Sequence, residues 1–146
     1  MSESPTRRAQ RRARVALLEG GIQGWANAGF ELFSGVNVPS KAFGEFVEHT
    51  YETPRLAAEE VKAMLDAGRD MVIVDSRPYS EYHRMSIPTG IDMPGAELAY
   101  RIHDVAPNPE TFVVVNCAGR TRSIIGTQSL INAGIPNPVA ALKDGT

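Results

Sequence analysis

From residue 53 onward, apolar residues fall into two alternating patterns. Short continuous runs rich in β-branched residues, MVIVD at 71–75 and TFVVVN at 111–116, predict buried strands. The segments around them predict helices, because their apolar residues recur every three or four positions. These helices are expected over 53–68, 78–85, 95–102 and 121–134, with a further strand, PVAAL, at 138–142. Repeated strand-to-helix steps predict an α/β fold with a mostly parallel central sheet and helices on both of its faces.

The helix predicted over 53–68 has one apolar face, with Gly68 as its C-terminal stop. This face is formed by Leu56, Val61, Met64 and Leu65.

The first fifty residues have a different pattern. The stretch ARVALLEGGIQGWANAGF, at 13–30, predicts a strand, a turn and a helix, with Trp25 and Phe30 as large apolar anchors. The stretch SGVNVPSKAFGEFVEHTY, at 34–51, predicts a linker that runs into a helix capped by Ser40.

Length and composition indicate an ordinary globular chain. Its 146 residues suffice for one domain with a proper core, and 42% of them are hydrophobic. No stretch approaches the ~20 apolar residues of a membrane span, and the N-terminus lacks the apolar core of a signal peptide. We therefore expect a cytoplasmic protein without a membrane partner.

The positive charge at the N-terminus is concentrated in RRAQRRAR, at 7–14. Such an arm could contact nucleic acid or an acidic lipid surface. No aromatic or fold-level signature of nucleic-acid binding accompanies it. We therefore interpret residues 1–14 as a disordered basic arm in solvent and expect no nucleic-acid partner.

The chain has one cysteine, Cys117, which rules out an internal disulfide and a multi-cysteine zinc site. The three histidines, His49, His83 and His103, do not have metal-ligand spacing. We expect neither a metal nor another cofactor.

Cys117 is predicted to lie where a strand gives way to a Gly- and Arg-rich loop and a helix. In open α/β sheets, ligands bind at the carboxyl ends of the strands. Loop amides and a helix N-terminus stabilise anions there, so they favour a thiolate, which is the nucleophilic form of cysteine. Gly119 allows a tight backbone path, and the small Ala118 leaves the sulfur accessible. The alternative is a buried cysteine acting as a small hydrophobe, although a core cysteine would be expected inside the valine run.

Two separated motifs resemble the rhodanese (sulfurtransferase) family. One is D-x-R-x-x-x-E-Y, formed here by Asp75, Arg77, Glu81 and Tyr82, ahead of an IPTG turn. The other is the loop CAGRTRS that opens with Cys117. The resemblance covers about residues 53–146. The chain departs from the family pattern at Met85-Ser86, where the family has Gly-His, and at IPTG, where it has IPGA.

The resemblance implies an activity and a set of site residues. A six-residue loop from Cys117 to Arg122 is linked to sulfur transfer, whereas the phosphatase and arsenate-reductase branch uses a loop one residue longer. Cys117 would be the catalytic nucleophile, taking sulfur from a small anionic donor such as thiosulfate and passing it to cyanide or a thiol. Asp75 is expected to brace neighbouring loops, and Arg77 either to brace or to contact substrate. The donor would be bound by Ala118, Gly119, Arg120, Thr121 and Arg122.

The N-terminal segment also resembles rhodaneses, but at the closing end of a repeat. VALLEGG and VAALKDGT read as the same strand and turn, followed by a helix in the first case only. We therefore expect a fragment of a tandem-rhodanese protein, with residues 15–52 as the end of one repeat plus a linker. Residues 53–146 would form a domain without its own closing helix. The segment around 22–30 could then cover the exposed sheet, within the chain or by exchange in a homodimer, or pack elsewhere with its own small cluster.

Three other functions stay open on the sequence alone. The chain could be a persulfide-binding or regulatory module without turnover. It could be an oxyanion hydrolase or reductase, or a redox sensor that uses the Cys117 thiolate.

Overall fold

The structure is a computed structural model that describes residues 16–32 and 38–146. The predicted basic arm at 1–14 lies outside the described residues. The chain divides into two compact units, Met1–Asn37 and Val38–Thr146.

The described part of the first unit is built around the short helix α2 (Gly21–Asn27), which follows a turn at Glu19 and Gly20. The rings of Trp25 and Phe30 lie 4.8 Å apart, and the Trp25 indole donates a hydrogen bond to the Glu31 carbonyl at 2.9 Å. No residue of α2 is buried. The predicted helix is confirmed, but residues 16–18 do not form the predicted strand, and 13–15 lie outside the described residues.

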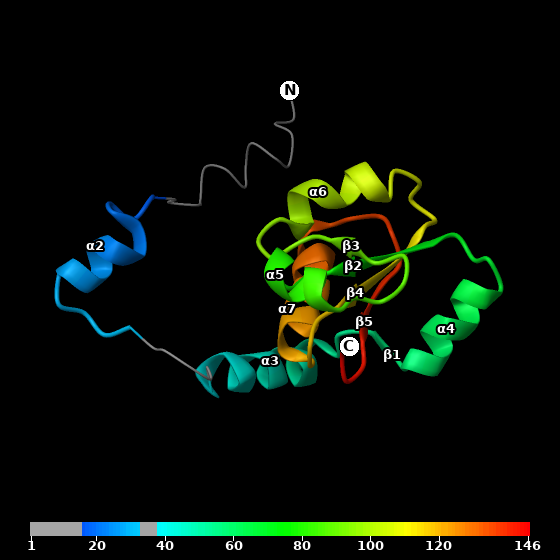
Figure 1. The fold of residues 1–146 in the computed structure, drawn as a ribbon, viewed down its shortest axis with the longest axis horizontal. Coiled ribbons are helices and arrows are strands. Elements are labelled where there is room, and N and C mark those ends of the chain that lie inside the picture. Colours follow the sequence, from blue (N-terminus) through cyan, green and yellow to red (C-terminus); the bar gives the residue numbers. More distant parts are fainter. Residues whose placement is uncertain (1–15, 33–37) are drawn as a thin grey trace, which may run out of the picture. The chain divides into compact units, whose positions relative to one another are not determined.

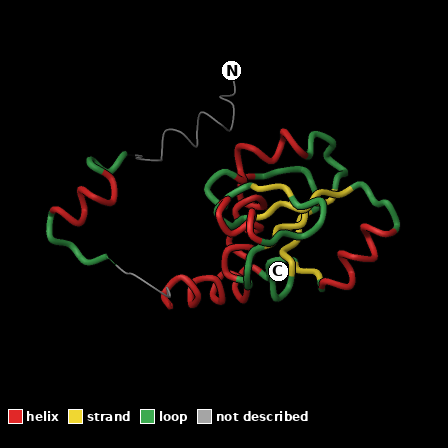
Figure 2. The backbone as a smooth tube through the Cα atoms, viewed as in Figure 1, coloured by secondary structure: helices red, strands yellow, loops and turns green. Residues whose placement is uncertain are grey.

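The second unit contains a five-stranded, fully parallel sheet in the order β1-β5-β4-β2-β3. In Figure 2 its strands are yellow and the helices around them are red. The strands are β1 (Arg55–Leu56), β2 (Met71–Asp75), β3 (Ile91–Asp92), β4 (Phe112–Asn116) and β5 (Val139–Leu142). Its helices are α3 (Val38–Tyr51), α4 (Ala58–Asp66), α5 (Tyr79–Arg84), α6 (Leu98–Val105) and α7 (Thr121–Ala133).

Alternation along β2 and β4 divides the core between the two faces of the sheet. Val74, Val113 and Val115 join α6 and α7 in one cluster, which also contains Leu98, Ile102 and Leu130. Ile73 and Val114 face the other way and join Val61 of α4 and Leu142. The predicted α/β fold with helices on both faces is thereby confirmed, and α3 packs against α7 (Figure 1).

Some local predictions were wrong. Leu56 belongs to strand β1 rather than to the helix after it, which begins at Ala58. Ser40 lies in the first turn of α3, because α3 begins at Val38. The second compact unit begins at Val38, because α3 packs against α7. The predicted start of the domain at residue 53 stays a prediction.

Within the described ranges, no helix is both long enough and apolar enough to cross a membrane.

Candidate functional site

Cys117 follows β4 directly, at the carboxyl edge of the parallel sheet. The Cys117 thiol donates a hydrogen bond to Ser123 Oγ at 3.5 Å, and Ser123 donates in turn to the Arg120 carbonyl at 3.0 Å. Cys117 is 1% exposed, so the expectation of an accessible sulfur next to Ala118 was wrong for this conformation. The thiol is inaccessible because the loop turns back into α7 and brings Ser123 against it.

The loop backbone around the thiol is rich in unpaired amides. Residues 118–120 are exposed, and α7 begins at Thr121. In the part of the chain that the structure describes, none of the hydrogen bonds outside regular helices and strands is donated by an amide of residues 118–122. Such a row of N–H groups at a helix N-terminus is a binding place for an anion. The predicted anion-binding residues are therefore together beside Cys117.

The turn after β5 supports this loop from one side. The Thr146 amide and hydroxyl both donate to the Cys117 carbonyl, at 2.8 and 3.0 Å. Gly145 has a φ of +72°, and a Cβ placed there would lie 2.3 Å from the Gly119 carbonyl oxygen. At Gly119 a Cβ would meet no atom within 4 Å, and φ is not positive. The position that requires glycine is therefore Gly145, which the sequence analysis did not identify.

Arg122 is held by a carboxylate of helix α5. Its guanidinium donates to both oxygens of Glu81, at 2.7 and 3.0 Å, and both side chains are about 40% exposed. These hydrogen bonds lower the pKa of Glu81 and raise the pKa of Arg122. Cys117 also contributes, more weakly, to the raised pKa of Arg122.

Arg120 is paired with helix α3. It donates to Glu45 at 2.6 Å and to Glu48 at 3.1 Å, and Glu48 also pairs with Arg55 at 2.5 Å. Gly44 comes close enough to Thr121 that a Cβ would lie 3.0 Å from its methyl carbon. Sequence reasoning missed these acidic partners because they lie more than 70 positions from Arg120.

Asp75 and Arg77 form a buried pair beneath the loop. Arg77 Nη2 donates to Asp75 at 2.7 Å and to the Met85 carbonyl at 2.6 Å, while Asn116 donates to Asp75 at 3.3 Å. The hydrogen bonds to Asp75 raise the pKa of Arg77. With 4% and 1% of their side chains exposed, the two residues have the contacts of a brace that ties β2 to β4 and to the 85–90 turn.

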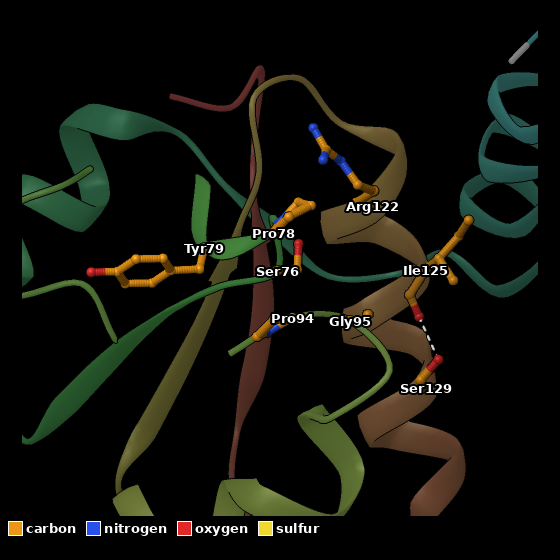
Figure 3. Close-up of a pocket in the computed structure, with 9 residues that line it drawn as sticks. Ser76, Pro78, Tyr79, Pro94, Gly95, Arg122, Ile125 and Ser129 are labelled. Atoms are coloured by element: carbon orange, nitrogen blue, oxygen red, sulfur yellow. Dashed lines mark hydrogen bonds between the residues drawn. The ribbon is translucent and has the colours of Figure 1, made fainter. Parts of the chain in front are cut away.

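A groove of about 450 Å³ lies beside α7, with Arg122 at one end. Figure 3 shows Arg122, Ile125 and Ser129 descending along α7 opposite Pro94 and Gly95, with the Tyr79 side chain directed away from that helix. We call it the α7 groove; its lining is Ser76, Pro78, Tyr79, Pro94, Gly95, Arg122, Ile125, Gly126 and Ser129.

Comparison with known proteins identifies the fold family. The model of the Rhodanese-like domain matches residues 57–146. A crystal structure of a thiosulfate sulfurtransferase from Pseudomonas aeruginosa is 64% identical with a TM-score of 0.76, over 96% of this chain and 27% of that chain. This chain therefore spans about a quarter of that protein.

Two further relatives are more distant. A proposed sulfur carrier protein of Bacillus subtilis, YrkF, is 23% identical over 136 residues, which cover 86% of this chain and 72% of that protein. The rhodanese-like domain of an Anabaena protein is 27% identical with a TM-score of 0.56, over 63% of this chain and 69% of that one. The resemblance drawn from the two motifs is confirmed, whereas the roles of the individual site residues stay predictions.

Proposed function

The chain belongs to the rhodanese-like domain family, and on that premise we propose that it is a sulfurtransferase that carries sulfane sulfur as a persulfide on Cys117. The observation that carries the proposal is the row of unpaired amides at 118–122, next to the chain's single thiol and at the N-terminus of α7. An anion bound at this row would lie beside the nucleophile.

Loading begins with the Cys117 thiolate, which attacks the outer sulfur of a small anionic donor such as thiosulfate. A sulfur–sulfur bond forms to Cys117, the sulfur–sulfur bond of thiosulfate breaks, and sulfite leaves with the electron pair. The terminal sulfur of the resulting persulfide is negatively charged at neutral pH. Amides of Ala118, Gly119, Arg120, Thr121 and Arg122 stabilise it by pointing at that charge.

In unloading, Cys117 changes from nucleophile to leaving group. Cyanide or a thiolate attacks the terminal sulfur, a bond forms to the acceptor, and the Cys117 thiolate is released with the electron pair. With cyanide the product is thiocyanate. No oxidant or cofactor enters either step.

Donor access requires a change at the loop, since Cys117 is 1% exposed. Arg120 and Arg122 are both engaged by carboxylates, and both are more than 40% exposed. An anionic donor competes with Glu45, Glu48 and Glu81 for these guanidinium groups, and exposed ion pairs are weak enough to exchange. In this proposal the donor therefore displaces the carboxylates from the two arginines as the loop opens.

Intact-protein mass spectrometry after brief incubation with thiosulfate tests the proposal. We expect the protein to gain one sulfur atom, which cyanide removes, and Cys117→Ser to gain none while keeping its far-UV circular dichroism. Because Cys117 is the only cysteine, no other thiol can account for the gain.

Each outcome is informative. A folded wild type that gains no sulfur contradicts the persulfide. When thiosulfate and cyanide are both in excess, thiocyanate formation that stops at about one equivalent per protein identifies a persulfide-binding module without turnover.

A further inference from the structure

The hydroxyl of Ser123 lies against the Cys117 sulfur in the interior of the protein. Ser123 is 0% exposed and Cys117 is 1% exposed, and the Sγ and Oγ atoms are 3.5 Å apart. Ser123 follows directly after the amides at 118–122 that are proposed to hold the terminal sulfur of the persulfide. Among the side-chain hydrogen bonds of the described residues, the one with Ser123 is the only one that involves this sulfur. The inner sulfur atom of the site therefore has a partner of its own, separate from the loop amides.

A serine hydroxyl has one proton to donate, and here two groups can accept it. With Cys117 as a thiol, the sulfur donates to Ser123 Oγ, and the hydroxyl donates to the Arg120 carbonyl at 3.0 Å. A thiolate has no proton to donate, and a charged acceptor attracts a donor more strongly than a neutral carbonyl does. When Cys117 loses its proton, the hydroxyl should therefore turn from the carbonyl to the sulfur.

The Arg120 carbonyl does not depend on this hydroxyl. It also accepts a hydrogen bond from the Ile124 amide at 3.0 Å, in the first turn of α7. Because the carbonyl already has this partner, the hydroxyl can turn away without leaving a buried acceptor unpaired. The turn requires only rotation of the Ser123 hydroxyl, and the polar groups stay paired before and after it.

We propose that Ser123 is a catalytic residue of this site, and that its hydroxyl stabilises negative charge on Cys117 Sγ. This inference rests on the persulfide chemistry proposed above and adds the group that acts on the inner sulfur. In unloading, cyanide or a thiolate takes the outer sulfur, the sulfur–sulfur bond breaks, and its electron pair stays on Sγ. Ser123 donates a hydrogen bond to the developing charge and keeps its proton.

The two half-reactions use this hydrogen bond differently. In unloading, the charge on Sγ first appears at the transition state, so a donor held against that atom accelerates the step. In loading, the charge is present from the start and is lost as the new bond forms. There the hydroxyl favours the thiolate at neutral pH but makes it less nucleophilic, and the two effects partly cancel. Removal of the hydroxyl should therefore slow unloading more than loading.

Quenched-flow mass spectrometry of the full chain measures each half-reaction, with thiosulfate for loading and cyanide for unloading of the loaded protein. At about pH 7, Ser123→Ala should unload about three- to tenfold more slowly than wild type. At about pH 10, above the ordinary range of thiol ionisation, its loading should equal or exceed that of wild type while its unloading stays slow. A variant with only structural damage would lose both steps at both pH values.

Ser129→Ala is the matched control on the same helix. Ser129 donates its hydroxyl to the Ile125 carbonyl at 2.7 Å, but its side chain is exposed. Both half-reactions should keep their wild-type rates in this variant. Arg122, the charged group whose pKa Cys117 affects, keeps its partner Glu81 in both variants. A difference between the variants therefore belongs to the hydroxyl beside Sγ.

Alkylation of Cys117 by iodoacetamide tests Ser123 without a sulfur donor, since the chain has no other cysteine. The ratio of the alkylation rate at about pH 7 to that at about pH 10 should fall about tenfold in Ser123→Ala and stay unchanged in Ser129→Ala. A wild type that takes up no sulfur contradicts the proposed function, and alkylation then decides whether Ser123 stabilises the thiolate.

Three results would overturn the role of Ser123. One is an alkylation ratio that is the same in Ser123→Ala and wild type. Another is a Ser123→Ala variant that unloads as fast as wild type. The third is loading at about pH 10 that is slowed as much as unloading, which would show that the variant has lost structure rather than a hydrogen bond to Sγ.

Discussion

Two glycines near Cys117 differ in whether their positions could accept a side chain. Gly145 has a positive φ and lies against the carbonyl oxygens of Cys117 and Gly119, whereas a side chain at Gly119 would project into open space. The backbone path beside the thiol therefore depends on a residue from the β5 turn, not on the glycine of the loop itself.

Replacing these glycines gives a matched pair of variants. Gly145→Ala should slow sulfur loading strongly and destabilise the fold by about 1–2 kcal/mol or more, since the left-handed conformation and the close carbonyls both oppose a Cβ. Gly119→Ala should stay close to wild type in both respects. Loading rates by mass spectrometry and urea midpoints provide the comparison, and equal loss of loading in the two variants would contradict it.

Helices α5 and α3 each present carboxylates to an arginine of the segment that follows Cys117, although both helices are far from Cys117 in the sequence. Glu81 on α5 pairs with Arg122, and Glu45 and Glu48 on α3 pair with Arg120. If the arginines receive the donor, these acidic groups weaken donor binding at neutral pH.

Glu81→Gln should therefore lower the KM for thiosulfate by about two- to fivefold, the range allowed by an exposed pair worth up to about 1 kcal/mol. Arg122→Ala should raise the KM and leave the unfolding midpoint nearly unchanged. The pKa of Glu81 is lowered, so the pair is intact above the ordinary carboxylate range and is lost as the pH falls through that lowered value. The KM advantage of Glu81→Gln should shrink in the same direction, and steady-state kinetics across acidic pH would show whether it does.

Elements with a strong local signal could be predicted from the sequence. MVIVD and TFVVVN form β2 and β4, and the helix expected over 121–134 is α7. Strands β1 and β3 have two residues each, too few for an apolar pattern to develop. In the site, the position of Cys117 followed from the pattern, but its contact with Ser123 and the acidic partners of Arg120 depend on tertiary packing.

The two units of the chain differ in how much core they have. Unit Val38–Thr146 contains both apolar clusters, while α2 in the other unit has no buried residue. Cooperative unfolding should therefore belong to the second unit, and Trp25 reports on the first.

Urea should unfold the helices and sheet of unit Val38–Thr146 in one transition seen by circular dichroism. Trp25 emission should remain almost flat through that transition. A Trp25 transition that coincides with the circular dichroism transition would contradict this expectation.

The short length of the two edge strands also limits how molecules can aggregate. Both outer strands, β1 and β3, are two residues long, so each margin offers very few unpaired N–H and C=O groups to a neighbouring molecule. Long, flat margins are the usual templates for strand addition and fibril growth, and short ones are a common protection against them. Native molecules in a concentrated solution should therefore resist cross-β precipitation, provided that the long central strands β2 and β4 stay covered.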